Sequence, residues 1–322
     1  MKEKILQLIY NSEGYLSGQQ ISESLGISRQ AVNKAVKGLR DKGFEIESAT
    51  NKGYKLISLP VDLCAESINL HLKTKFVGRN IRLLDTVGST NDYLKALAEK
   101  GAEAGTVVLS REQTSGKGRL GRSWMSKRDE TISMSILLRP DMMPSEIASI
   151  TPLAGLAMCR AVNDFCMLDS RIKWPNDIIV GRKKLVGILT EMASQPDKVE
   201  YTVTGIGINV SNTSFPDEIA HKATSILLET GRHIDRNKFV ATALNYLEQE
   251  IVQNRYRLGG EAVAEYQRLC ATIGRQVTFA RGKRNVSGMA VSVSNNGELG
   301  VMLSNGTVVT VNAGEVTVQG IY

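Results

Sequence analysis

The feature that most restricts the fold is a glycine-rich basic segment, residues 111–124, with β-strand patterns before and after it. It contains Gly116-x-Gly118-x-x-Gly121, the spacing of a dinucleotide-binding turn. That turn must open a helix, whereas a strand pattern follows here. The phosphate-loop pattern fails as well, because Gly116-Lys117 is followed by Gly118 instead of Ser or Thr. We therefore expect neither fold. The segment is interpreted as a loop that closes over a multiply anionic ligand, with a mobile basic surface loop as the alternative.

Residues 1–60 show three short amphipathic helix patterns followed by a hairpin pattern. Ser17 and Gln20 form a capping box at the second helix, and Ser28 caps the third. Strand patterns then flank residues 51–53, a turn signal. We predict a winged helix-turn-helix that binds DNA, with protein contacts as the alternative. The side chains expected to face bases or phosphates are Ser28, Arg29, Gln30, Asn33, Lys34 and Lys37.

Three further segments of the central region carry polar residues beside apolar strand patterns. Ser89, Thr90 and Asn91 begin a helix pattern, where they either cap the helix or bind a polar ligand. Residues 173–177 read KWPND, and Lys184 starts the next strand pattern, so Lys184 is the base expected to face a ligand. Glycines at 205 and 207 interrupt a later strand pattern, which predicts close approach of a ligand to the backbone.

The last third of the chain changes from helix patterns to strand patterns. Helices are expected at 238–258 and 261–270. Residues 276–318 then alternate apolar and polar side chains between turns at 296–297, 305–306 and 313–314, which predicts a small meandering barrel.

Composition restricts the class of protein. The 322 residues include 40 Lys and Arg against 33 Asp and Glu, a net charge of +7. The longest apolar stretch, 147–168, is interrupted by Pro152, Arg160 and Asp164, so no membrane span is predicted. Four scattered cysteines without a CxxC pair favour a reduced, cytoplasmic protein. Three histidines outside any cluster argue against a zinc site.

Taken in order, these motifs resemble the bifunctional biotin-protein ligases that also repress the biotin operon. The resemblance extends along the whole chain: the helix-turn-helix, GSTN at 88–91, Gln113 with GKGRLGRSW at 116–124, KWPND, KLVGIL at 184–189 and GIGIN at 205–209. One departure is Lys117, where the family usually has Arg, which keeps the charge but loses the bidentate fork.

The resemblance implies an α+β protein of three domains. These are a winged helix-turn-helix at 1–60, a ligase domain at 66–268 similar to the class II aminoacyl-tRNA synthetases, and an SH3-like β-barrel at 270–322. It also implies a two-step reaction. The biotin carboxylate attacks the α-phosphate of ATP to give biotinyl-5′-AMP, and a lysine of the biotin carboxyl carrier protein of acetyl-CoA carboxylase then takes the biotin.

The site residues carried over from the resemblance fall into three groups. Lys184, Arg119 and Asp177 are expected to be catalytic, with Asp177 orienting Lys184 or supporting the Mg²⁺ that accompanies ATP. No dedicated metal-ligand set is expected. Biotin contacts are expected from Ser89, Thr90, Asn91, Gln113, Gly116, Lys117, Gly118, Arg119, Lys184, Gly187 and Gly205. Nucleotide contacts are expected from Arg119, Arg122, Trp124, Asn176, Lys184 and Asn209.

Three other functions were weighed against this one. A ligand-sensing repressor with an inactive ligase core is disfavoured by the intact Lys184 and basic loop. A lipoate-type ligase is disfavoured because GKGRLGRSW differs from the RRxSGGG run expected of those enzymes. A ligase with a vestigial DNA-binding domain stays open. For the bifunctional protein, the expected partners are the carrier protein, operator DNA and a second copy of the chain in a ligand-induced homodimer.

Overall fold

The computed structural model describes residues 1–282, 284–312 and 316–322. Its contacts separate two compact units. The first contains Met1–Lys73 and Asp235–Ala241, and the second contains Thr74–Ile234 and Thr242–Tyr322.

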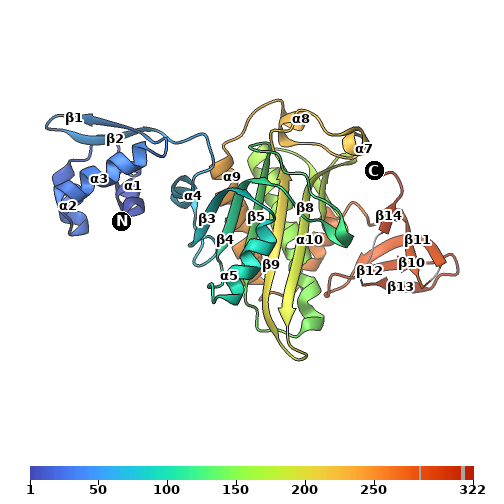
Figure 1. The fold of residues 1–322 in the computed structure, drawn as a ribbon. Coiled ribbons are helices and arrows are strands. Elements are labelled where there is room, and N and C mark those ends of the chain that lie inside the picture. Colours follow the sequence, from blue (N-terminus) through green and yellow to red (C-terminus); the bar gives the residue numbers. More distant parts are fainter. Residues whose placement is uncertain (283, 313–315) are drawn as a thin grey trace. The chain divides into compact units, whose positions relative to one another are not determined.

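The first unit contains the predicted helix-turn-helix with its hairpin (Figure 1). Ser17 and Gln20 form the capping box, and Gly26 ends the second helix in the left-handed conformation, as expected. The third helix ends at Arg40, three residues before the expected Gly43, and a turn fills the difference. The elements are α1 (Lys2–Tyr10), α2 (Gly18–Leu25), α3 (Arg29–Arg40), β1 (Glu45–Ala49), β2 (Gly53–Ser58) and α4 (Ala65–His71).

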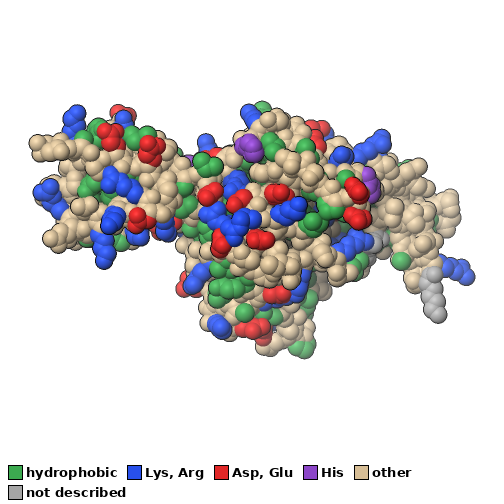
Figure 2. All heavy atoms as spheres, turned by 45° about the horizontal axis from the view of Figure 1, so that its top comes forward, with side chains coloured by type: hydrophobic (Ala, Val, Ile, Leu, Met, Phe, Trp, Pro, Cys, Tyr) green, Lys and Arg blue, Asp and Glu red, His purple; other side chains and the backbone are tan. Residues whose placement is uncertain are grey.

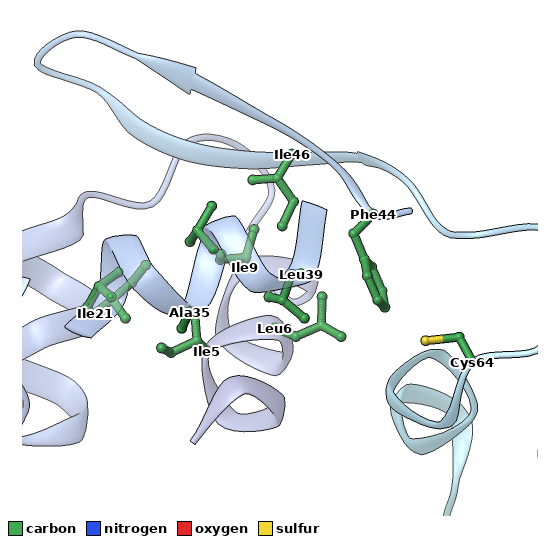
Figure 3. Close-up of a cluster of buried hydrophobic side chains, with 11 residues drawn as sticks. Ile5, Leu6, Ile9, Ile21, Ala35, Leu39, Phe44, Ile46 and Cys64 are labelled. Atoms are coloured by element: carbon green, nitrogen blue, oxygen red, sulfur yellow. The ribbon is translucent and has the colours of Figure 1, made fainter. Parts of the chain in front are cut away.

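One hydrophobic cluster holds this unit together (Figure 3). Ile5 and Leu6 of α1 and Leu39 of α3 are fully buried, and Phe44 joins them from the segment before β1. This burial leaves the opposite face of α3 to solvent, because an amphipathic helix buries only one stripe. The exposed residues include all six predicted DNA contacts, Ser28, Arg29, Gln30, Asn33, Lys34 and Lys37.

The second unit is built on a seven-stranded mixed sheet (Figure 1). The strand order is β3-β4-β5-β9-β8-β7-β6, in which only β3 and β4 are parallel. The strands are β3 (Ile81–Val87), β4 (Val107–Gln113), β5 (Thr131–Leu138), β6 (Ser170–Lys173), β7 (Asp177–Val180), β8 (Lys183–Ser194) and β9 (Val199–Asn209). Strand β6 was not predicted, because its four residues, Ser, Arg, Ile and Lys, are mostly polar and resemble a loop.

Helices of this unit pack on the two faces of the sheet. On one face α5 contacts β4, β5 and β9, with Leu94 packed among Val108, Leu137 and Val203. On the other face α6 contacts β6, β7 and β8, and α10 packs against α6. The helices are α5 (Thr90–Glu99), α6 (Ile150–Cys166), α7 (Asp217–Ala220), α8 (Ile226–Thr230) and α10 (Glu261–Leu269), with 3₁₀ turns η1 (Arg119–Gly121) and η2 (Pro144–Ser149). Helix α9 (Arg236–Gln253) is divided between the units, since its residues up to Ala241 belong to the first and those from Thr242 to the second.

The C-terminal part of the second unit is a five-stranded antiparallel sheet, ordered β13-β12-β11-β10-β14. The predicted turns at 296–297 and 305–306 are present, each with a glycine at positive φ. The predicted turn at 313–314 lies outside the described residues. The strands are β10 (Gln276–Arg281), β11 (Arg284–Val293), β12 (Leu299–Met302), β13 (Val308–Val311) and β14 (Val316–Val318).

The described residues also bear on three properties considered from composition: membrane-spanning helices, the cysteines and the distribution of charge. Among them, no helix is both long enough and apolar enough to cross a bilayer. All four cysteines are buried and unpaired. On the face shown in Figure 2, Lys and Arg side chains lie among Asp and Glu side chains and do not gather in one separate patch.

Candidate functional site

The register of the seven-stranded sheet brings two predicted site residues, Gly187 and Asp177, into one row with residues of the neighbouring strands. Residues directly opposite each other in antiparallel strands point to the same face. In the sheet order from β4 to β6, one residue of each of six strands is therefore paired with the next, and all six point to the same face. The row is Ser110, Ser133, Gly207, Gly187, Asp177 and Lys173. Two residues from Gly207 along β9, Gly205 pairs with Ser135 on one side and Leu189 on the other.

The glycines of this face make room for two side chains. A Cβ on Gly205 would lie 2.3 Å from Asn91 Oδ1, and a Cβ on Gly207 would lie 2.3 Å from Trp124 Cε2. Gly187 lies under the same indole, since a Cβ there would be 2.9 Å from Trp124 Cζ3. These glycines thus leave room for Asn91 and Trp124, and all of these residues line the small pocket. The expectation that the glycines also admit a ligand to the backbone stays a prediction.

A small polar pocket of about 50 Å³ lies beside these glycines. Gln113 Oε1 accepts hydrogen bonds from Thr90 N (2.8 Å) and Thr90 Oγ1 (3.1 Å). Ser135 Oγ donates to Asn91 Oδ1 (2.6 Å). Asn91 Nδ2 donates to Glu191 Oε2 (2.7 Å), which fixes the amide orientation. These connected polar groups present a rigid arrangement of donors and acceptors to a ligand.

Ser89 has a structural role at this pocket. Its hydroxyl caps α5 by accepting from Asp92 N (3.5 Å), while the residue itself lines the pocket. Lys117 lies at the same pocket with its Nζ 2.6 Å from Asp92 Oδ2, and its side chain is about half exposed. The helix-cap interpretation of Ser89 is therefore confirmed, and binding of a ligand by Ser89, Thr90 and Asn91, which line the pocket, stays a prediction.

A second cavity of about 710 Å³ adjoins the first. The two share Gly118, Arg119, Trp124, Asn176 and Lys184. Its apolar wall includes Phe215 and Ile219, and Asn209 lines it while donating to Thr224 O (3.0 Å). Six cations line this cavity against two acids, Glu130 and Asp177. They are Arg119, Arg122, Lys127, Lys173, Lys184 and Lys222. Such an excess of positive charge suits a polyanion with an apolar end.

The glycine-rich basic segment, residues 111–124, is held in a compact turn by hydrogen bonds of its own backbone. Gly118 N donates to Arg122 O (2.7 Å), and Trp124 N donates to Gly116 O (2.8 Å). Gly116 has no room for a side chain, since its Cβ would lie 2.4 Å from Trp124 O. Arg119 reaches across to Asn176 Oδ1 (3.1 Å), and its burial lowers the pKa of its guanidinium. The loop thus places Arg119 between the two pockets.

Asp177 and Lys184 form an ion pair at this junction. Lys184 Nζ lies 2.7 Å from Asp177 Oδ1, although that oxygen makes no well-aligned hydrogen bond. The same Nζ lies 5.5 Å from the centroid of the Trp124 ring. Because Lys184 lines both pockets, its ammonium can contact groups held in either one.

Three residues at the site were absent from the predicted set. Glu191 binds both Asn91 and Lys95. Tyr322 donates to Asp177 Oδ2, and Lys173 lies over the Tyr322 ring. Burial, together with nearby Lys184, Arg122 and Lys222, lowers the pKa of Lys173 to about 8. Lys173 stood in the KWPND motif, but no pattern in the sequence links position 322 to position 177.

The described residues do not form a metal site of their own. Among residues 1–282, 284–312 and 316–322, no three His, Cys, Asp or Glu side chains gather as a metal-binding group. Asp177 lies beside Lys184 through Oδ1 and accepts a hydrogen bond from Tyr322 at Oδ2. Its two expected roles, orienting Lys184 or supporting Mg²⁺, both stay predictions. A Mg²⁺ ion would be held mainly by the nucleotide phosphates and water, as Mg²⁺ commonly is.

Comparison with known proteins assigns families to three parts of the chain. Residues 83–209 match the Biotin/lipoate A/B protein ligase family, residues 2–55 an HTH domain, and residues 272–318 the Biotin protein ligase C terminal domain.

Individual relatives extend the likeness along the chain. The Bifunctional ligase/repressor BirA of Bacillus spizizenii is 42% identical over 224 residues, 69% of each chain. The protein of that name from Escherichia coli is 26% identical over 316 residues, 98% of this chain and 96% of the other. The solved biotin protein ligase of Aquifex aeolicus, in complex with biotin and ATP, superposes with a TM-score of 0.65 at 26% identity, covering 75% of this chain and 99% of that one.

Proposed function

The chain belongs to the family of bifunctional biotin ligase/repressors, and from that premise we propose that it is an ATP-dependent biotin-protein ligase that also represses transcription. The observation that supports this best is the pair of adjoining pockets with Lys184 between them. One pocket is small and lined by a connected polar network, and the other is large and cationic. This is the arrangement needed to hold a neutral ring system and a nucleotide with their reacting groups together.

In the first step the biotin carboxylate attacks the α-phosphate of ATP, and pyrophosphate leaves. Thr90, Asn91 and Gln113 hold the biotin head in the small pocket, and the nucleotide occupies the large one. Lys184 and Arg119 lie where the two meet and neutralise the negative charge that develops on the attacked phosphate. Trp124 forms a wall between the two ligands. A Mg²⁺ ion that accompanied the nucleotide would neutralise further phosphate charge.

In the second step the amine of a lysine on the carrier protein attacks the mixed anhydride, and AMP leaves. No covalent enzyme intermediate is required, so catalysis depends on positioning and charge. We place the acceptor, as in the biotin–[acetyl-CoA-carboxylase] ligases, on the biotin carboxyl carrier protein. The expected setting is the cytoplasm, consistent with four unpaired cysteines.

The domain assignment is also part of this proposal. We assign DNA binding to residues 1–60, the ligase reaction to a catalytic domain at 66–268 similar to the class II aminoacyl-tRNA synthetases, and an SH3-like barrel to 270–322. The seven-stranded mixed sheet with helices on both faces supports the second, and the five-stranded antiparallel sheet supports the third.

The test of the ligase function is biotin-dependent exchange of labelled pyrophosphate into ATP by the full chain. We expect exchange with biotin and none without it. Absence of exchange with biotin, in protein that is folded by circular dichroism, would contradict adenylation as the activity.

Repression requires more than one recognition helix, because a single α3 contacts only a few base pairs. We propose that biotinyl-5′-AMP favours a homodimer that binds a two-fold symmetric operator. By linkage, operator DNA must then tighten dimerisation by the same free energy. Sedimentation and operator binding with and without biotinyl-5′-AMP test this. An association state that is indifferent to the adenylate would leave a ligase with a vestigial DNA-binding domain.

A further inference from the structure

Tyr322 connects the segment after β14 with the ion pair at the junction of the pockets. Its hydroxyl donates to Asp177 Oδ2, and its ring centroid lies 3.5 Å from Lys173 Nζ. The backbone beside it is tied to β14 by a bridge between Ile321 and Val318. One side chain thus contacts both the carboxylate and a second ammonium of the large pocket.

Two cations, Lys173 and Lys184, lie near the single carboxylate of Asp177 and compete for it. Lys173 and Asp177 are directly opposite each other in the β6–β7 pairing, so their side chains share a face of the sheet. Asp177 nevertheless pairs with Lys184, through Oδ1. Its other oxygen is occupied by the Tyr322 hydroxyl. No ion pair of Lys173 is present within the part of the chain that the structure describes.

A cation over an aromatic ring is held more weakly than a cation paired with a carboxylate. Lys173 therefore stays available to an anion that enters the large pocket. Burial and Asp177 also raise the pKa of the Tyr322 phenol, so its hydroxyl remains a donor throughout the physiological range. If the hydroxyl were absent, Asp177 would lose the hydrogen bond that fixes its orientation toward Lys184. If the ring were absent as well, Lys173 would be released and would pair with Asp177.

We propose that Tyr322 is a positioning residue for adenylation, whose hydroxyl keeps Asp177 on Lys184 and whose ring keeps Lys173 free for the nucleotide phosphates. This inference rests on the proposed ligase function and adds to it a residue from the C-terminal segment. The two parts of the side chain have separate roles. Removal of the hydroxyl alone should disturb Lys184, and removal of the ring should also disturb Lys173.

The experiment compares two substitutions of Tyr322 with a matched control in the full chain. Tyr322→Phe removes the hydroxyl and keeps the ring, and Tyr322→Leu removes both. Tyr246 provides the control, because its hydroxyl also donates to a carboxylate, that of Asp164, but neither residue lines either pocket. Biotin-dependent pyrophosphate exchange is measured for each variant as kcat and as KM for ATP, alongside thermal unfolding.

We expect Tyr322→Phe to lower kcat by about tenfold, the effect of losing one charge-assisted hydrogen bond that positions a catalytic group, with KM for ATP within about twofold of wild type. Tyr322→Leu should show the same fall in kcat and also raise KM for ATP by about tenfold, so that Phe rescues KM but not kcat. Tyr246→Phe should leave both parameters unchanged.

Several outcomes would overturn the inference. These are a Tyr322→Phe variant equal to wild type, a Tyr322→Leu variant equal to Tyr322→Phe in KM, or losses of exchange that only follow the folded fraction. An equal loss in Tyr246→Phe would show that any Tyr–Asp bond matters, which also counts against it. Wild-type protein without exchange would instead contradict the proposed function, so the two failures are distinguishable.

Discussion

The two units of this protein present their functional residues in opposite ways. In the first, six predicted DNA contacts lie within ten consecutive positions, in α3 and its N-cap Ser28, and are all exposed. In the second, the residues around Lys184 come from positions as distant as 89 and 322 and lie in partly buried pockets. A recognition face is therefore a local property of α3, whereas the pockets exist only because sheet register brings remote segments together. Substitutions should affect one contact in the first case and a whole network in the second.

The largest expected effect is that of Lys184→Ala. Lys184 lines both pockets and pairs with Asp177, so its loss removes the charge that both ligands share and leaves a partly buried carboxylate without its partner. Pyrophosphate exchange should fall by about 10²-fold or more. Lys183→Ala, which changes the exposed neighbour, serves as the control. Near-wild-type exchange by Lys184→Ala would remove this residue from the site.

The small pocket can be disturbed without changing any polar residue. In Gly205→Ala the new Cβ would lie 2.3 Å from Asn91 Oδ1 and displace the amide. Because displacements of about 1 Å can cost about 10²-fold, KM for biotin should rise by up to that factor while KM for ATP changes little.

The control for this change is Gly259→Ala, since no atom lies within 4 Å of its Cβ position. If Gly205→Ala raised both KM values equally, the two pockets would not be separate binding sites.

On the recognition helix, the effect of Arg29→Ala should be confined to DNA. Loss of a bidentate contact to guanine costs about 1 to 3 kcal/mol of binding free energy, or about 30-fold near the middle of that range. Operator titration at fixed salt measures the loss. Pyrophosphate exchange should be unchanged, because Arg29 belongs to the other compact unit. A variant that bound operator normally would indicate that Arg29 reads no base.

The smallest effect concerns pH and Lys173. Burial and the cations Lys184, Arg122 and Lys222 lower the pKa of Lys173 to about 8, opposed by Asp177. The ammonium over the Tyr322 ring is thus mostly protonated at pH 7 and mostly neutral at pH 9. The affinity for ATP should fall by about fivefold between pH 7 and pH 9, because Lys173 loses its positive charge over this range. The phosphate groups, with a second pKa of about 6, are already ionised at pH 7 and change little.

The sign of this effect follows from proton linkage. An anion favours the protonated ammonium, so binding weakens as pH rises through about 8. The contribution of Lys173 to the free energy of unfolding changes with pH in the opposite direction. The unfolded chain, with the ordinary lysine pKa of 10.5, binds more protons between pH 8 and 10.5, so stability rises across that window. Lys173→Arg keeps its charge and should bind ATP equally at pH 7 and 9. A wild-type affinity that is flat with pH would show that Lys173 does not contact the phosphates.

The sequence alone determined the features that depend on neighbouring residues. The capping box of Ser17 and Gln20 and the left-handed Gly26 are local, so the helix-turn-helix and its exposed face could be predicted from their spacing. The KWPND run and the basic loop likewise predicted which segments carry chemistry. Tertiary structure decided the rest. Cross-strand pairing aligned Gly207, Gly187, Asp177 and Lys173 in one row, and sheet register depends on contacts between distant strands. The contact of Tyr322 with Asp177 spans 145 positions. No periodicity or motif reports such a contact, because only packing of the whole unit brings the two side chains together.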